Sequence, residues 1–252
     1  MLPIIPLTVL AFIAGAVFGS FVDCLAWRCV RGENMCRGRS RCDVCGEVLR
    51  ARDLIPILSH VCLRGRCRYC GAPVSLRHLL TELLLGGAFA AAVLRFGWSW
   101  QSLEACGLFA VLLGLSLVDL ESLVIPNGFI LAGILWWLPT LLLTDGTLLA
   151  RLSFAMSGSA MAALVLAMVL VFEKLTKQES MGGGDIKLFF MVGLYLGFWQ
   201  SLLNLILACL AGIAFSLAIG ARRIPFGPSI AAATAVTFLW GAPVVEWYLG
   251  LF

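Results

Sequence analysis

Eight apolar runs, most of them near the length that crosses a bilayer, constrain the fold of this chain more than any other feature. They cover about residues 2–22, 79–96, 103–118, 125–143, 152–172, 186–198, 202–220 and 229–249. A transmembrane helix needs roughly 20 mostly apolar residues, and a segment in hydrocarbon must satisfy its backbone hydrogen bonds internally. With 61% hydrophobic and only 13% charged residues, the sequence predicts an all-α polytopic membrane protein with about eight transmembrane helices.

The basic residues predict how these helices are oriented. No basic residue precedes the first run, whereas Arg28 and Arg31 follow it, which is the reverse of a secretory signal peptide. Eight alternating spans then put sixteen of the eighteen lysines and arginines on one side, and only Arg95 and Arg151 on the other. Because positively charged loops stay in the cytoplasm, we expect a multi-pass protein of the cytoplasmic (inner) membrane with its N-terminus outside.

Only one polar stretch is long enough to form a domain of its own. We expect a first transmembrane helix over residues 1–25, a cytoplasmic cysteine-rich domain over 26–78 and a membrane-embedded domain over 79–252. The net charge of +4 does not indicate nucleic-acid binding, because the arginines flank the spans and no aromatic stacking platform accompanies them. Membrane lipid is the expected contact instead.

The cysteine-rich domain contains two CxxC pairs, each followed by glycine: Cys42 with Cys45, and Cys67 with Cys70. A domain of this size usually needs a metal or disulfides to fold, and disulfides are rare in the cytoplasm. Four thiolates suit tetrahedral zinc, so we predict a structural metal site; redox-active dithiols and unliganded cysteines are the alternatives. His60 and His78 are further candidate ligands, although a polar contact is the favoured interpretation for each.

Two aspartates stand at the ends of apolar runs. Asp119 precedes a break at Pro126, and Asp185 follows three glycines in the motif Gly182-Gly183-Gly184-Asp185-Ile186-Lys187. An ionised side chain in hydrocarbon costs about 2.5–3.5 kcal/mol on insertion scales, so an intramembrane acid is a candidate functional residue. Asp185 also suits a helix N-cap. Asp119 does not, because it lies at the C-terminal end of its helix, where the helix dipole disfavours an anion.

A pair of carboxylates that approach across helices can share a proton and hydrolyse a peptide bond. The ionised group takes a proton from the attacking water, and the protonated group polarises the carbonyl oxygen and then protonates the leaving amine. We therefore predict Asp119 and Asp185 as catalytic residues. Four further residues are predicted to support them: Gly182 and Gly184, which permit close backbone approach, Lys187 at the membrane boundary, and the acid Glu121.

The order of these motifs resembles that of the bacterial type IV prepilin peptidases, a family of GxGD membrane aspartic proteases. The resemblance runs nearly end to end and is carried by Gly19-Ser20-Phe21, the two CxxC pairs, Asp53-Leu54-Ile55-Pro56-Ile57-Leu58-Ser59, Asp119 ahead of Ile125-Pro126, the Gly182 to Lys187 motif and Ile224-Pro225-Phe226-Gly227-Pro228. The chain departs from the family pattern at Asn127, where an aspartate is common, and at Arg77-His78-Leu79, which replaces an Arg-Tyr-Pro-like run.

This resemblance implies an endopeptidase that removes the basic leader from type IV prepilins and from the pseudopilins of type II secretion, on the cytoplasmic side. Residues 79–252 would be its peptidase domain. Members with the cysteine domain often also N-methylate the new N-terminal residue from S-adenosylmethionine, and Gly65 matches a family glycine beside the second cysteine pair. We further expect Glu121, Glu173 and Glu179 to form an acidic rim that attracts the basic leader.

Two other classes of protein fit the aspartates alone. In an ion- or proton-coupled transporter, Asp119 and Asp185 would relay protons or bind a cation, but such proteins commonly carry inverted repeats and the sequence has none. In a membrane-anchored zinc module both aspartates would be helix-end caps, which leaves the second acid and the Pro-containing breaks unexplained.

Overall fold

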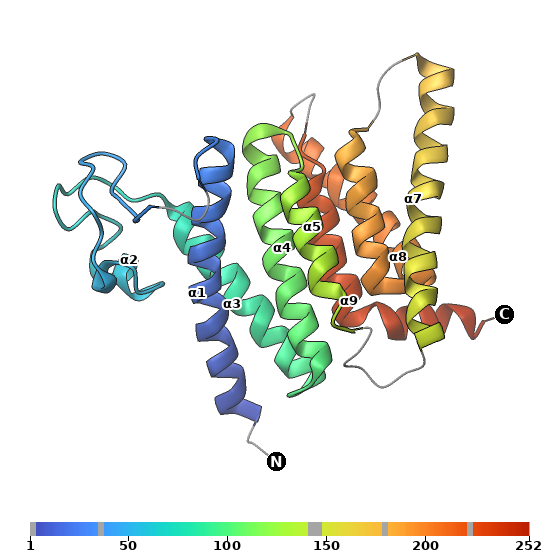
Figure 1. Ribbon diagram of the computed structural model, residues 1–252, viewed down its shortest axis with the longest axis horizontal. Helices are drawn as coiled ribbons and strands as arrows, with labels where there is room; N and C mark the ends of the chain where they lie inside the picture. The colour runs from blue at the N-terminus through green and yellow to red at the C-terminus, as the bar shows by residue number, and fades with distance from the viewer. Residues whose placement is uncertain (1–3, 35–37, 141–147, 178–180, 221–223, 252) are drawn as a thin grey trace. The chain divides into compact units, whose positions relative to one another are not determined.

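Helices form nearly all the regular structure. In chain order they are α1 (Ile4–Val30), the short η1 (Ala51–Asp53) and α2 (Leu58–Cys62), α3 (Leu76–Phe96), α4 (Trp100–Ser122), α5 (Asn127–Trp137), α7 (Leu148–Thr176), α8 (Gly183–Ile219) and α9 (Gly227–Leu249) (Figure 1). The structure is a computed structural model and describes residues 4–34, 38–140, 148–177, 181–220 and 224–251. Within these ranges no strand forms, only two isolated bridges, so the predicted all-α class is confirmed.

Six of the described helices are long and apolar enough to cross a membrane, namely α1, α3, α4, α7, α8 and α9. The sequence predicted about eight spans because α8 contains two of the predicted runs. Its backbone leaves helical geometry at Gly197 (φ 71°, ψ −179°), so its 37 residues form two segments joined by a kink. The predicted run over 125–143 gives the shorter α5, of 11 residues, and residues 141–147 lie outside the described part.

The surfaces of these helices suit hydrocarbon. Large apolar side chains stay open to the surroundings along most of them; Leu175 of α7 is 79% exposed and Leu217 of α8 is 80% exposed. Apolar exposure on this scale would be unusual for a protein surface in water. It is the expected outer face of a bundle in lipid.

The chain divides into two compact units, Met1–Ser102 and Leu103–Phe252. In the first, α1 packs along α3, and glycines make the close crossing possible. A Cβ atom on Gly15 would lie 2.6 Å from the Leu85 carbonyl oxygen, and one on Gly86 would lie 3.0 Å from the Phe12 carbonyl oxygen. Small residues that let backbones approach are typical of helix pairs in membranes.

In the second unit, α7 and α9 pack against α8, and α5 also contacts α8. Its core consists of apolar side chains from α4, α7, α8 and α9, the most enclosed being Leu108, Leu115, Met161, Leu188, Met191 and Ile230. This packing brings the C-terminal end of α4 and the N-terminal ends of α5 and α8 to one cavity, and the first residue of α9 contacts the α4 end.

Candidate active site

Asp119 lies in the last turn of α4, where the helix stops abruptly. Leu123 adopts a left-handed conformation (φ 54°) and its N–H donates to the Asp119 carbonyl oxygen at 2.9 Å. The chain then passes through extended Pro126 into α5. Asp119 is 4% exposed, so a carboxyl group is buried at the C-terminal end of a membrane helix.

Asp185 lies in the first turn of α8, which begins after the Gly182 N-cap. Its own N–H donates to the Gly182 carbonyl oxygen at 3.1 Å. The predicted close approach occurs at Gly184, where a Cβ atom would lie 3.0 Å from the Cβ of Ile125. The glycine run therefore lets the start of α8 pack against the segment that follows α4.

Asp119 and Asp185 line the same cavity, of about 360 Å³. Its other lining residues are Leu123, Val124, Ile125, Asn127, Gly182, Gly184 and Lys187. Lys187 is fixed at this cavity because its Nζ donates to Asn127 Oδ1 at 3.0 Å. The cavity thus presents two carboxyl groups and one ammonium group. The backbone of Gly182 and Gly184 lies open beside them, because glycine has no side chain to cover it.

Three supporting residues from the sequence, Gly182, Gly184 and Lys187, lie at this cavity, and the fourth does not. Glu121 is exposed near the end of α4 and is not among the lining residues. Of the other members of the expected acidic rim, Glu173 is partly exposed near the end of α7, and Glu179 lies outside the described residues.

One residue at the site was not predicted. The N–H of Gly227, the first residue of α9, donates to Asp119 Oδ2 at 2.8 Å in a buried hydrogen bond. The sequence carried a partial signal, since Gly227 belongs to the Ile224 to Pro228 motif. The pattern alone gave no reason to pair it with an aspartate 108 positions away.

The four paired cysteines also meet in space. The Sγ atoms of Cys42, Cys45, Cys67 and Cys70 all lie within 4.8 Å of one another. The Cys42 and Cys70 sulfurs are 3.9 Å apart, close to the separation of about 3.8 Å that tetrahedral zinc with bonds of about 2.3 Å requires.

Each CxxC pair forms the same tight turn. The Gly46 N–H donates to the Cys42 carbonyl oxygen, and the Gly71 N–H donates to the Cys67 carbonyl oxygen, both at 2.9 Å. These glycines have φ values of 71° and 72°, which a side chain would disfavour.

The two knuckles differ in how they hold their sulfurs. Backbone N–H groups of Cys45 and Val44 lower the pKa of the Cys42 thiol to about 7, and the thiolate is the form that binds metal. At Cys70 a backbone hydrogen bond from Ala72 acts in the same direction. Desolvation and the neighbouring thiols outweigh it, and the pKa rises to about 11. A cation among the four sulfurs would favour the thiolate form at each of them.

Gly65 lies in the first unit. Its backbone is in the left-handed region (φ 65°), and the imidazole ring of His60 lies against it. A Cβ atom at this position would lie 3.1 Å from Nε2 of His60. The turn and the ring account for a glycine here without any cofactor.

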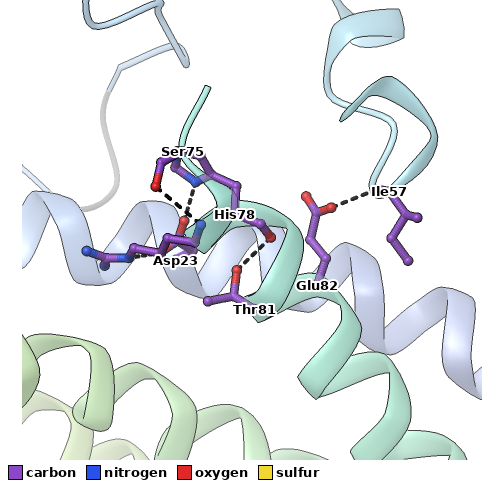
Figure 2. A network of polar contacts seen from close by, with 7 residues as sticks. Asp23, Ile57, Ser75, His78, Thr81 and Glu82 are labelled. Carbon is purple, nitrogen blue, oxygen red and sulfur yellow. Dashed lines mark hydrogen bonds and ion pairs between the residues drawn. The ribbon is translucent and has the colours of Figure 1, made fainter. Parts of the chain in front are cut away.

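His78 lies at the other end of the cysteine-rich domain, in a polar network (Figure 2). Its Nδ1 pairs with Oδ2 of Asp23, whose other oxygen accepts from Arg77 Nε at 2.8 Å. Asp23 is only 2% exposed, so α1 and α3 are joined by a buried carboxyl group that contacts both Arg77 and His78.

A second buried acid ties α3 to the loop that precedes α2. Glu82, 7% exposed, accepts a hydrogen bond from the Ile57 N–H at 2.7 Å (Figure 2). Ile57 has φ 63°, an unfavourable conformation for a β-branched residue. The Glu82 bond therefore holds a strained turn of the cysteine-rich domain against α3.

The apolar helices and the cavity lined by Asp119 and Asp185 together define a helical membrane protein with two carboxyl groups at the ends of its spans. Comparison with known proteins specifies it further. The Bacterial Peptidase A24 N-terminal domain matches residues 13–96, and the Type IV leader peptidase family matches residues 106–217. The chain belongs to the type IV leader peptidase family.

Curated relatives agree with this assignment. The chain is 38% identical to a prepilin leader peptidase/N-methyltransferase of Burkholderia pseudomallei, over 83% of this chain and 70% of the relative. A protein of the same name from Aeromonas hydrophila is 36% identical, over 86% and 76%, and one from Bacillus subtilis is 30% identical, over 94% and 96%. No solved structure matches the chain.

Proposed function

We propose that this protein is a membrane aspartic endopeptidase that removes the leader from type IV prepilins and pseudopilins, with Asp119 and Asp185 as its catalytic residues. One observation carries the proposal: two acids 66 positions apart in the sequence, on α4 and α8, line one cavity in a chain of the type IV leader peptidase family. The family assignment gives no support to the transporter alternative.

The catalytic step uses one proton shared between the two carboxyl groups. The ionised group takes a proton from water while the water oxygen bonds to the peptide carbonyl carbon, and the other carboxyl group donates a hydrogen bond to the carbonyl oxygen. The carbon–nitrogen bond then breaks and the amine leaves with a proton from the carboxyl pair. Lys187, held by Asn127, contributes positive charge to the same cavity.

The substrate approaches from the cytoplasm in this proposal. The distribution of basic residues supports a cytoplasmic side for the ends of α4 and α8, in the cytoplasmic membrane. A prepilin leader is basic and would meet the acidic rim before the cavity. The hydrophobic helix that follows the leader would remain in lipid, and nucleic acid has no part in the reaction.

The names of the relatives support a second activity, N-methylation of the new N-terminus. S-adenosylmethionine would supply the methyl group when bound. Gly65 is the residue that the family resemblance assigns to this activity, and its contact with His60 supports a role in shaping the turn beside Cys67. The four cysteines fit zinc, which would hold the two knuckles together and so stabilise a domain with little core of its own.

The test uses detergent-purified full-length protein and a prepilin that retains its leader. We expect mass spectrometry to find a new N-terminus after the leader with the wild type and none with Asp119→Asn or Asp185→Asn. A second reaction with S-adenosylmethionine reports methylation of the product. Cleavage that survives either substitution would exclude the aspartic mechanism.

A further inference from the structure

The start of α9 forms one wall of the Asp119 environment. The Gly227 N–H holds Oδ2 of the carboxylate at 2.8 Å, and no larger residue fits, because a Cβ atom on Gly227 would lie 2.7 Å from the same oxygen. A hydrogen bond of this length weakens steeply if the donor moves. The position of α9 along its own axis therefore decides how Asp119 is oriented.

The position of α9 is fixed by its packing against the second segment of α8, the part that follows the kink at Gly197. Close to the start of α9, Gly212 makes room for the Phe226 ring, since a Cβ atom there would lie 2.9 Å from Cε2 of that ring. Seven residues beyond Gly227, about 10 Å along the helix, Thr234 Oγ1 contacts Asn204 Oδ1 of α8 at 3.4 Å.

Both partners of this contact are enclosed. Asn204 and Thr234 are each 0% exposed, and in the apolar interior no bulk water replaces a lost hydrogen bond. The Thr234 hydroxyl has one proton and also bonds the Ile230 carbonyl oxygen, at 2.7 Å. Among the described residues, Nδ2 of Asn204 has no partner. The two ends of an asparagine amide are exchanged by a half-turn, after which Nδ2 donates to the Thr234 oxygen, the Thr234 hydroxyl keeps its proton for the Ile230 carbonyl oxygen, and the Asn204 oxygen takes the position that has no partner among the described residues.

We propose that Asn204 and Thr234 are positioning residues of the peptidase site, because their hydrogen bond holds α9 in the register at which the Gly227 amide meets Asp119. The role rests on the proposed function, in which Asp119 is catalytic. Neither residue touches the cavity, and both act through α9.

The chain offers a matched control on the same helix. Thr237 lies one turn further along α9, is also 0% exposed, and its hydroxyl has no hydrogen-bond partner among the described residues. Thr234→Val and Thr237→Val therefore make the same isosteric change in the same interior, and only the first removes an interhelical hydrogen bond.

The experiment measures kcat, KM and the pH profile of prepilin cleavage for full-length Thr234→Val, Thr234→Ser, Thr237→Val, Asn204→Leu and Gly227→Ala. We expect kcat to fall about ten- to a hundredfold in Thr234→Val, Asn204→Leu and Gly227→Ala, with KM little changed, since a small misplacement of a reacting group costs rates of this order. The pH profile should be displaced in all three. Thr234→Ser should restore the wild-type values, and Thr237→Val should retain them.

Hydrogen–deuterium exchange of the Gly227 amide gives a readout that does not need activity. The amide should exchange faster in Thr234→Val than in the wild type and in Thr237→Val. If that difference appears while the wild type cleaves no prepilin, the proposed function is wrong and the positioning contact stands.

Two outcomes would overturn the inference. One is an active enzyme whose kcat, pH profile and Gly227 exchange are unchanged in Thr234→Val. The other is an equal loss in Thr234→Val and Thr237→Val, which would assign the effect to packing of α9 and not to the hydrogen bond.

Discussion

The carboxyl group of Asp53 accepts three hydrogen bonds within the cysteine-rich domain. It accepts hydrogen bonds from Arg68 Nε at 2.6 Å, the Tyr69 hydroxyl at 2.9 Å and the Arg50 N–H at 3.2 Å. The Arg68 bond is the main reason why the pKa of this carboxyl group lies below its usual value. Because Arg68 and Tyr69 stand between Cys67 and Cys70, Asp53 fixes the second knuckle from outside.

We predict that Asp53→Asn loosens this knuckle in a pH-dependent way. A carboxylate whose pKa is lowered by folding stabilises the folded state above its unfolded pKa, about 3.9, and that contribution disappears as the pH falls through the folded value. Hydrogen exchange of residues 64–74 should therefore be faster in Asp53→Asn than in the wild type at pH 7. The difference should shrink to nothing in acid, and a difference that persists there would contradict the ionic role.

Glu121 allows a test of the acidic rim at the residue scale. It is exposed and outside the cavity, so its charge can act on the leader at a distance but not on the reacting atoms. Glu121→Gln should raise KM for a leader-bearing prepilin by a few-fold at low salt and leave kcat unchanged, and 0.5 M salt should remove the effect by screening. An unchanged KM at low salt would remove Glu121 from the rim.

The sequence predicted the two acids and not the groups that orient them. A carboxylate at the end of an apolar run is visible in the sequence because its cost in hydrocarbon is high at any position. The partner of Asp119 is a backbone N–H, which every residue except proline has, and Asn204 acts only through the helix that carries that N–H. Such contacts depend on how α8 and α9 pack, and no local pattern encodes them.

At the scale of elements, the crossing of α1 and α3 depends on which face each glycine occupies. Gly86 and Gly87 are neighbours on α3, yet a Cβ atom on Gly86 would meet Phe12 of α1 and one on Gly87 would meet nothing within 4 Å. Gly86→Ala should lower the stability of the first unit by about 1–3 kcal/mol through overpacking. Gly87→Ala should be neutral or slightly stabilising.

Thermal unfolding of the two single variants in the same detergent checks this prediction. The matched pair cancels the effect of alanine on helix propensity, because both positions lie in the middle of α3. Equal melting temperatures would show that α1 does not press on Gly86 in the folded protein.

Element boundaries were less predictable than element type. Apolar length indicated each span, and the runs predicted over 186–198 and 202–220 correspond to the two segments of α8, but the kink lies at Gly197 and not at the polar Gln200 and Ser201 that separate the runs. At α5, a long apolar run forms only 11 helical residues before the chain turns. Hydrophobicity reports the surroundings of a segment, whereas its path depends on a few backbone angles.

At the scale of the whole molecule, the four-cysteine group and the pair of aspartates belong to different compact units. The four cysteines lie within Met1–Ser102, and the lining residues of the acidic cavity all lie within Leu103–Phe252. Each group is completed by its own unit: the cysteines by two knuckles, and the aspartates by α4, α8 and α9. We therefore expect the metal and the peptidase site to fail independently.

Metal removal tests this independence. Cys42→Ser, or a chelator applied to the wild type, should release the metal and expose residues 40–74 to rapid hydrogen exchange, because four-thiolate knuckles without metal lose the bond that joins them. Chelation should become easier as the pH falls, because protons compete with the metal for the four thiolates. Prepilin cleavage should stay within about twofold of the wild type, since the two sites share no residues and sites without shared partners are close to additive. Cys62→Ser, an exposed cysteine outside the group, is the matched control and should keep its metal. If cleavage declines in proportion to metal content, the knuckles support the peptidase site and the two units act as one.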